Sequence, residues 1–119
     1  MIVGFGGATI WSEDINKSLR AFYSDVIGIK IRMDAPEFIV FGDANVAAFA
    51  LGTHSDVKGL NRDPSRTMVG FVTDDVEAEY QRLKSAGVEF VDPPTDFPQL
   101  IIATLKDPEG NYVQLFQMK

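Results

Sequence analysis

The same order of expected elements occurs twice along this chain, and no other feature restricts its fold as strongly. Each half reads as a strand, a helix and three further strands. The aspartates at the two expected helix starts, Asp14 and Asp75, are 61 residues apart, and the glycines expected to end the helices, Gly28 and Gly87, are 59 apart. Residue identity between the halves is weak, so the repeat rests on the order of elements.

In the first half, apolar residues that recur every three or four positions predict a helix over residues 14–27. Ser12 or Asp14 can cap its start, because a short side-chain oxygen accepts hydrogen bonds from free backbone N–H groups. Alternating or β-rich runs predict the strands of this half at residues 29–33, 38–41 and 46–51, with a turn at 42–45.

In the second half, the first strand is expected at residues 68–73, and a helix capped by Asp74 or Asp75 follows and ends at Gly87. The later strands are expected at residues 88–91, 100–105 and 112–117. Prolines between residues 92 and 98 predict a loop. The polar segment 52–65 is interpreted as a linker between the halves.

These elements predict an α+β fold of two βαβββ repeats that form a curled mixed sheet around a cavity. We expect a single domain over residues 1–119, with repeat one at about 1–57 and repeat two at about 66–119. A half of roughly 55 residues would bury little surface alone, whereas paired halves create a concavity in which small ligands usually bind. The linker is long enough for the halves to pair within one chain or to be exchanged between chains.

Composition excludes several classes of protein. There is no cysteine and only one histidine, His54, so disulfides, thiolate zinc sites and His-rich metal sites within one chain are excluded. The net charge of −6 disfavours nucleic-acid binding. No apolar run approaches the roughly 20 residues of a membrane span, and the N-terminus lacks the basic region of a signal peptide. We therefore expect a cytoplasmic protein.

Two stretches carry a resemblance to a known family. Residues 14–28 read DINKSLRAFYSDVIG, and residues 105–115 read LKDPEGNYVQL. Together with the second helix, residues 74–88, they resemble the vicinal oxygen chelate superfamily, also called the glyoxalase/bleomycin resistance protein/dioxygenase superfamily. The resemblance implies paired βαβββ repeats, a homodimer and a U-shaped cavity. In metal-using members, four inward side chains chelate one divalent cation, which binds vicinal oxygens of the substrate.

Carried over to this sequence, the four metal-ligand positions fall at Gly7, Ala50, Met68 and Gln114. Glycine and alanine have no donor atom, a thioether does not suit a hard dication, and one amide oxygen cannot replace four ligands. A register slip of one residue does not help, because the neighbours are also non-ligating: Ala8, Phe49, Val69 and Val113. We therefore expect no metal and no cofactor.

The expected ligand-binding residues combine apolar and aromatic walls with a polar anchor: Trp11, Ala50, Met68, Tyr112, Gln114 and Phe116. Trp11 is either a ring that stacks on a flat ligand or a tryptophan of the core or rim. Tyr112, Gln114 and Phe116 alternate along one strand and so share a face. Phe49 is an alternative wall to Phe116. Small residues are expected to leave room on the inner face: Gly7, Ala48, Ala50, Gly52 and Gly70.

Two other features have a simpler structural interpretation. His54 is either a general base, since imidazole titrates near neutrality, or a solvated histidine of the linker, and the second interpretation is favoured. The turn from Asp107 to Asn111 is expected to be structural, because aspartate accepts from turn N–H groups and glycine adopts positive φ.

The sequence therefore predicts a metal-free small-molecule-binding protein of the bleomycin-resistance type, with a hydrophobic or aromatic ligand between the repeats. The alternative is a lyase or dioxygenase-like enzyme of the same superfamily with a non-standard metal site or with His54 as the base. Against it stands the lack of a convincing catalytic set. A third interpretation is a closed cavity and a role in protein association. We expect a homodimer with a small-molecule ligand and neither nucleic acid nor membrane as a partner.

Overall fold

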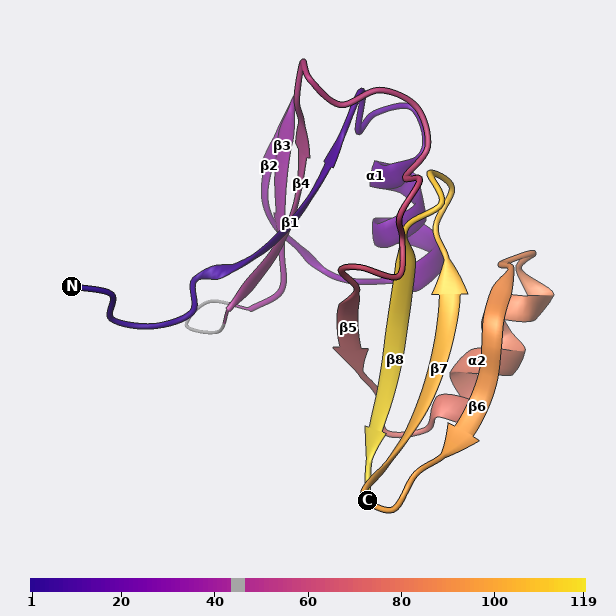
Figure 1. Ribbon diagram of the computed structural model, residues 1–119. Helices are drawn as coiled ribbons and strands as arrows, with labels where there is room; N and C mark the ends of the chain where they lie inside the picture. Colours follow the sequence, from indigo (N-terminus) through magenta and orange to yellow (C-terminus); the bar gives the residue numbers. More distant parts are fainter. Residues whose placement is uncertain (44–46) are drawn as a thin grey trace. The chain divides into compact units, whose positions relative to one another are not determined.

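The computed structural model describes residues 1–43 and 47–119. The chain divides into two compact units, Met1–Gly59 and Leu60–Lys119, each of which contains one βαβββ repeat (Figure 1). The predicted α+β fold with two repeats is therefore confirmed. The division falls inside the segment interpreted as a linker. In the turn predicted at 42–45, Ala44 and Asn45 lie outside the described residues, as does Val46 of the following strand.

The first unit forms a four-stranded mixed sheet in the order β1-β4-β3-β2, in which only the β1–β4 pair is parallel. We call it the first sheet. Its elements are β1 (Gly7–Ser12), α1 (Leu19–Ala21), the π-helix η1 (Phe22–Ile27), β2 (Ile31–Ala35), β3 (Phe38–Phe41) and β4 (Ala48–Thr53).

The second unit repeats this topology in the order β5-β8-β7-β6, again with one parallel pair, β5–β8. We call it the second sheet. Its elements are β5 (Val69–Val72), α2 (Val76–Ser85), β6 (Phe90–Asp96), β7 (Leu100–Lys106) and β8 (Tyr112–Met118). In Figure 1, α2 lies beside β6.

In each unit, a helix packs on one face of the sheet, and the core lies between them. In the first unit this core is aromatic: the Tyr23 ring lies 5.0 Å from Phe49 and 6.5 Å from Phe41, measured between centroids. In the second unit it is mainly aliphatic and includes Val76, Leu83, Leu105, Val113 and Leu115. Phe49 is 8% exposed and belongs to this helix-facing core, so its prediction as a ligand wall is wrong.

The predicted start of the first helix is also wrong. Residues 15–18 form turns, and helical structure begins at Leu19. The Ser12 hydroxyl accepts from the Asp14 N–H at 3.0 Å, and the Asp14 carboxylate accepts from the Asn16 N–H at 2.9 Å. Local bonds of this kind compete with helical ones, and here they stabilise turns. The helix then widens into a π-helix, and the Gly28 N–H donates to the Tyr23 carbonyl at 3.1 Å.

The second helix begins as predicted. The Asp75 carboxylate accepts from the Ala78 N–H at 3.0 Å, which is the geometry of an N-cap. The Gln117 side chain accepts from the Val76 N–H at 2.8 Å and ties the helix start to β8. Within the described part of the chain, no helix has the length and apolar character needed to cross a bilayer.

The segment predicted as a proline-rich loop is largely a strand. β6 runs through Pro93 and Pro94 to Asp96. It is an edge strand, and its register shifts between Phe90 and Asp92 and again between Asp92 and Thr95. Prolines are tolerated at sheet edges and bulges, because no ladder hydrogen bond is required from their nitrogen there.

Candidate ligand-binding site

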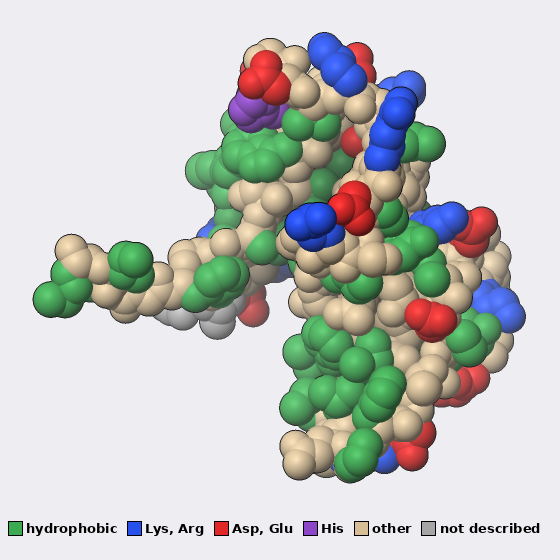
Figure 2. Space-filling view, viewed as in Figure 1, with side chains coloured by type: hydrophobic (Ala, Val, Ile, Leu, Met, Phe, Trp, Pro, Cys, Tyr) green, Lys and Arg blue, Asp and Glu red, His purple; other side chains and the backbone are tan. Residues whose placement is uncertain are grey.

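The face of each sheet opposite its helix, which we call the open face, carries the candidate binding surface. On the second sheet, one cross-strand row of this face consists of Gly70, Gln114, Thr104 and Asp92, one residue from each strand. Figure 2 shows hydrophobic side chains gathered on this unit over β5 and β8. Partners in a row point to the same face, so the amide, the hydroxyl and the carboxylate project together.

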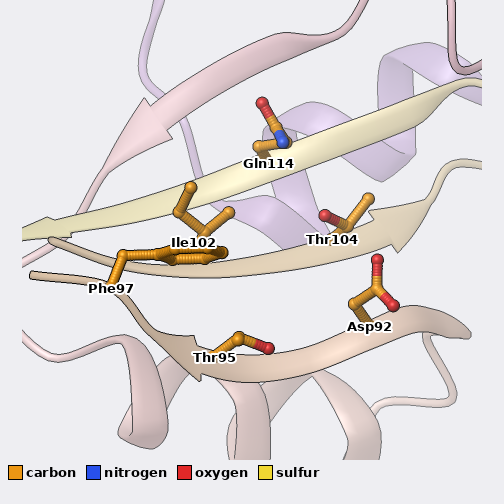
Figure 3. A pocket seen from close by; sticks show the side chains of 6 residues that line it. All are labelled: Asp92, Thr95, Phe97, Ile102, Thr104 and Gln114. Carbon is orange, nitrogen blue, oxygen red and sulfur yellow. The ribbon is translucent and has the colours of Figure 1, made fainter.

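A pocket of about 290 Å³ opens over this row. It is lined by Asp92, Thr95, Phe97, Ile102, Thr104 and Gln114 (Figure 3). Its volume lies near the lower end of the usual range for small-ligand sites. Four of the six lining side chains are polar, and Phe97 and Ile102 supply the apolar part of the wall.

A β-bulge is the reason that Asp92 lies in this pocket. Phe90 pairs with Leu105, while Asp92 pairs with the adjacent residue Thr104, so β6 holds one extra residue, Val91. Phe90 packs on Tyr80 of α2 with 4.7 Å between ring centroids, so it points to the helix face. Strict alternation would place Asp92 on that face too. The extra residue instead turns the carboxylate to the open face.

The other carboxylates near β6 have cationic partners. Glu89 accepts from Lys106 Nζ at 2.9 Å, and Asp96 forms an ion pair with Lys119. The hydrogen bond from Lys106 to Glu89, together with the attraction of its charge, raises the pKa of Lys106 above 10.5. Asp92 forms no ion pair within the described residues.

The apolar wall of the pocket comes from Ile102 and from Phe97, a residue that is 46% exposed. Phe116 lies in the row next to the polar one, opposite Ile102. A Cβ atom built at Gly70 would overlap the Phe116 ring, so this ring lies directly over the glycine. The expectation that Gly70 leaves room is wrong, because an aromatic side chain fills that space.

The open face of the first sheet carries an aromatic cluster, formed by Trp11, Phe38 and His54. The Trp11 ring lies 6.0 Å from Phe38 and 5.6 Å from His54, the second contact being edge-to-face. A Cβ atom built at Gly52 would overlap Trp11. Gly52 therefore also leaves no empty space, and Trp11, 46% exposed, presents part of its ring to solvent.

His54 is held locally rather than presented to a substrate. Its Nδ1 accepts a hydrogen bond from the Asp56 N–H at 3.1 Å, and its ring rests on Trp11. The lone pair that a general base would use is thus engaged by the backbone. This geometry, with His54 exposed, favours its interpretation as a solvated histidine of the linker.

The six predicted ligand residues are spread over both units. Trp11 and Ala50 lie on the open face of the first sheet, in adjacent rows. Tyr112, Gln114 and Phe116 share the open face of β8, as alternation predicted, and Met68 is half-buried just before β5. Among these six residues, only Gln114 lines the pocket.

Sequence reasoning missed the other five lining residues, Asp92, Thr95, Phe97, Ile102 and Thr104. Thr104 and Ile102 alternate along β7, so the pairing of β7 with β8 would have identified them. Asp92 and Thr95 had no such signal, because their segment was interpreted as a loop and contains two shifts of register.

The donor set does not fit the superfamily metal ion. Ala50 and Gln114 occupy the second and fourth of the expected metal-ligand positions. Their strand partners are Thr9 and Gly70, and these add only one further donor group, the Thr9 hydroxyl. The residues described contain no group of three or more His, Cys, Asp or Glu that could hold a metal. Divalent cations need several carboxylate, imidazole or thiolate ligands, and these positions do not supply them.

Comparisons with known proteins give one family. The sequence profile of the Glyoxalase/Bleomycin resistance protein/Dioxygenase superfamily matches residues 4–115. The solved structure of a protein of unknown function from Agrobacterium tumefaciens is 21% identical in sequence, with a TM-score of 0.78. The match covers 100% of this chain and 97% of that protein's chain.

TnmS3, an antibiotic binding protein from a Streptomyces species, is 23% identical with a TM-score of 0.74. The match covers 99% of this chain and 98% of the TnmS3 chain. A glyoxalase/bleomycin resistance protein/dioxygenase family enzyme from Burkholderia phytofirmans is 20% identical, with a TM-score of 0.72. The match covers 96% of this chain and 98% of that enzyme's chain. At these identities the likeness shows the fold alone.

Proposed function

Because the chain belongs to the Glyoxalase/Bleomycin resistance protein/Dioxygenase superfamily, as its sequence resemblance predicted, we propose that it binds a hydrophobic or aromatic small molecule without a metal ion. The observation that carries this proposal is the composition of the open faces. They present aromatic rings and aliphatic side chains, and the positions where metal-using members place their ligands hold Gly7, Ala50, Met68 and Gln114. Such a surface recognises a ligand by contact area and a few hydrogen bonds.

Two features support an aromatic ligand. The pocket of the second unit places the exposed Phe97 ring and Ile102 beside Gln114 and Thr104. The first unit exposes part of the Trp11 ring on the equivalent face. Aromatic rings pack on one another in stacked or edge-to-face arrangements that contribute beyond the buried area. TnmS3, which has the same fold, is an antibiotic binding protein, and we carry this property to the present chain only as part of the proposal.

The first test is a thermal-shift screen with planar aromatic antibiotics and aromatic metabolites. A compound that binds only the native state raises the melting temperature, and a hundredfold excess over its Kd adds about 2.7 kcal/mol to the free energy of unfolding. We expect a planar aromatic compound to shift the wild type, and Phe97→Ala to reduce the shift. Phe5→Ala, which removes an exposed ring of the N-terminal segment, is the matched control. The absence of any shift across the screen would contradict the proposal.

The second test measures metal in protein purified without chelator. We expect far less than one equivalent of zinc, nickel, manganese or iron per chain. A stoichiometric metal would overturn the metal-free part of the proposal and favour the lyase or dioxygenase-like alternative, in which turnover should then depend on that metal.

We also propose a cytoplasmic homodimer. Exposed apolar residues on the open faces, such as Met33 and Val72, are a reason to expect association. Light scattering coupled to size exclusion should give twice the chain mass at micromolar concentration. A monomer at that concentration would contradict this part of the proposal.

A further inference from the structure

Among the residues that the structure describes, none forms an ion pair with the carboxylate of Asp92, which lines a pocket of about 290 Å³. We propose that this pocket recognises a ligand with a cationic nitrogen, for which Asp92 is the counter-ion, while Phe97 and Ile102 contact its flat apolar part. The inference rests on the proposed binding function and specifies the chemistry of the ligand.

The first argument is the distribution of charge around β6. The carboxylates on either side of Asp92 along the chain, Glu89 and Asp96, form ion pairs with Lys106 and Lys119. These ion pairs also occupy Lys106 of β7 and Lys119, which follows β8. The pocket lining contains no other ionisable side chain, so the carboxylate attracts a cation without local competition. The net charge of −6 of the chain also attracts cations at long range.

The second argument is the balance of hydrogen-bond donors and acceptors. An ionised Asp92 only accepts. The Thr95 hydroxyl already donates to the Pro93 carbonyl at 3.0 Å, so it also offers only lone pairs to a ligand. Thr104 is 5% exposed, lines the pocket and has a hydroxyl that can accept as well as donate. Gln114 adds an amide oxygen and an NH2 group, so the lining offers acceptors from all four polar side chains and N–H donors from one. Such a lining matches a ligand group rich in N–H donors, such as an ammonium, amidinium or aminoarene.

The third argument is the direction of the side chains. Figure 3 shows Asp92, Thr104 and Gln114 projecting from three adjacent strands to the same side of the sheet, with the Phe97 ring near Ile102. A cation held by Asp92 would therefore have an aromatic ring within the same pocket. Cations are attracted to the faces of aromatic rings, so Phe97 adds to the recognition of a cationic arene.

The bulge at Val91 makes this placement specific. It turns the carboxylate to the open face, while Asp96 pairs with Ile101, the neighbour of the pocket residue Ile102, and so points to the other face. The same strand thus provides both the test residue and its control. Asp92→Asn and Asp96→Asn remove one negative charge each, but only the first removes it from the pocket.

The experiment compares two dyes with the same tricyclic ring system at pH 8: proflavine, a diamino derivative that is cationic, and acridine, which is neutral. We expect the wild type to bind proflavine at least about tenfold more tightly than acridine in a fluorescence titration, as a charge-assisted contact would give. Asp92→Asn should remove that preference and leave acridine binding within about twofold. Asp96→Asn should preserve the preference. Salt should weaken proflavine binding more than acridine binding.

Three results would overturn the inference. Equal binding of both dyes by the wild type would show that the carboxylate does not select a cation. Equal losses in Asp92→Asn and Asp96→Asn would show a general charge effect. Binding of neither dye by the wild type would also exclude it. The first two results leave the proposed function intact, whereas the function itself fails only if no compound shifts the melting temperature in the separate screen.

Discussion

The two sheets have the same topology but different chemistry on their open faces. Equivalent rows are Thr9, Ala50, Val40 and Met33 in the first sheet, and Gly70, Gln114, Thr104 and Asp92 in the second. Even the bulge recurs, since the register also shifts between Ile31 and Met33. One repeat thus offers an apolar surface and the other a polar pocket on the same backbone. The backbone sets where side chains point, and the residues at those positions set what they can bind.

In both sheets, an aromatic ring from one strand of the parallel pair lies over a glycine of the other strand, but the strand that supplies the ring differs. In the first sheet an aromatic residue of β1, Trp11, covers a glycine of β4, Gly52. In the second sheet an aromatic residue of β8, Phe116, covers a glycine of β5, Gly70. The ring needs the missing Cβ to lie flat on the sheet, so glycine and aromatic residue form one unit in each repeat.

The largest expected effect tests the contrast between the aromatic and the aliphatic core. Phe41 and Leu105 occupy equivalent positions and are 1% and 0% exposed. Phe41→Ala should lower the free energy of unfolding by about 3–5 kcal/mol and Leu105→Ala by about 2–5 kcal/mol, because each leaves a cavity. Urea titration measures both. A loss below about 1 kcal/mol for Phe41→Ala would show that the aromatic cluster repacks without cost.

The next largest effect compares the aspartates of the two equivalent hairpin turns, Asp107 and Asp43. Asp107 is 5% exposed, and its carboxylate accepts from the N–H groups of Glu109 and Asn111 at 2.9 and 3.0 Å. This confirms the structural role predicted for the turn. Asp107→Ala should lower the free energy of unfolding by about 1–3 kcal/mol, since it leaves partly buried N–H donors without this acceptor. Asp43 at the equivalent position is exposed, so Asp43→Ala should change stability by less than about 0.5 kcal/mol. Equal effects in thermal unfolding would remove the distinction between the turns.

The two aromatic–glycine pairs give a smaller effect with a separate readout. Gly52→Ala should displace the Trp11 ring, shift the emission of the single tryptophan to longer wavelength and cost about 1–3 kcal/mol. Gly70→Ala should displace Phe116 at a similar cost without changing the tryptophan spectrum. An unchanged spectrum in Gly52→Ala would mean that Trp11 does not depend on the glycine.

The smallest effect is the pH dependence of the exposed pair of Lys106 with Glu89 in the second unit. The pKa of Lys106 is raised, so the folded state binds its proton more tightly than the unfolded state. The stabilisation is therefore complete below the ordinary lysine pKa and is lost as the pH rises through the raised value in the folded state. The stability difference between wild type and Glu89→Gln should persist at pH 7–9 and fade as the pH rises through the raised pKa of Lys106. A difference that persists at high pH would rule out this ion pair as its cause.

Much of the fold was predictable because its signals are local. The alternation of Tyr112, Gln114 and Phe116 predicted the face that each occupies on β8, and the cap at Asp75 predicted the start of α2. The residue at which the first helix begins was not predictable, because Ser12 and Asp14 can accept hydrogen bonds in turns as well as in helix caps. Their oxygens fit both structures, and the local sequence does not decide between them.

By itself, the sequence determined the repeat of βαβββ units, the superfamily and the lack of metal ligands at the expected positions. These follow from periodicity, turn residues and residue type, which are properties of short segments. Only the tertiary structure decided that β6 passes through two prolines and that its extra residue turns Asp92 into the pocket beside Thr104. The reason is that the face of a residue in a bulged strand depends on its pairing with a distant strand, and a period of two along one strand does not contain that information.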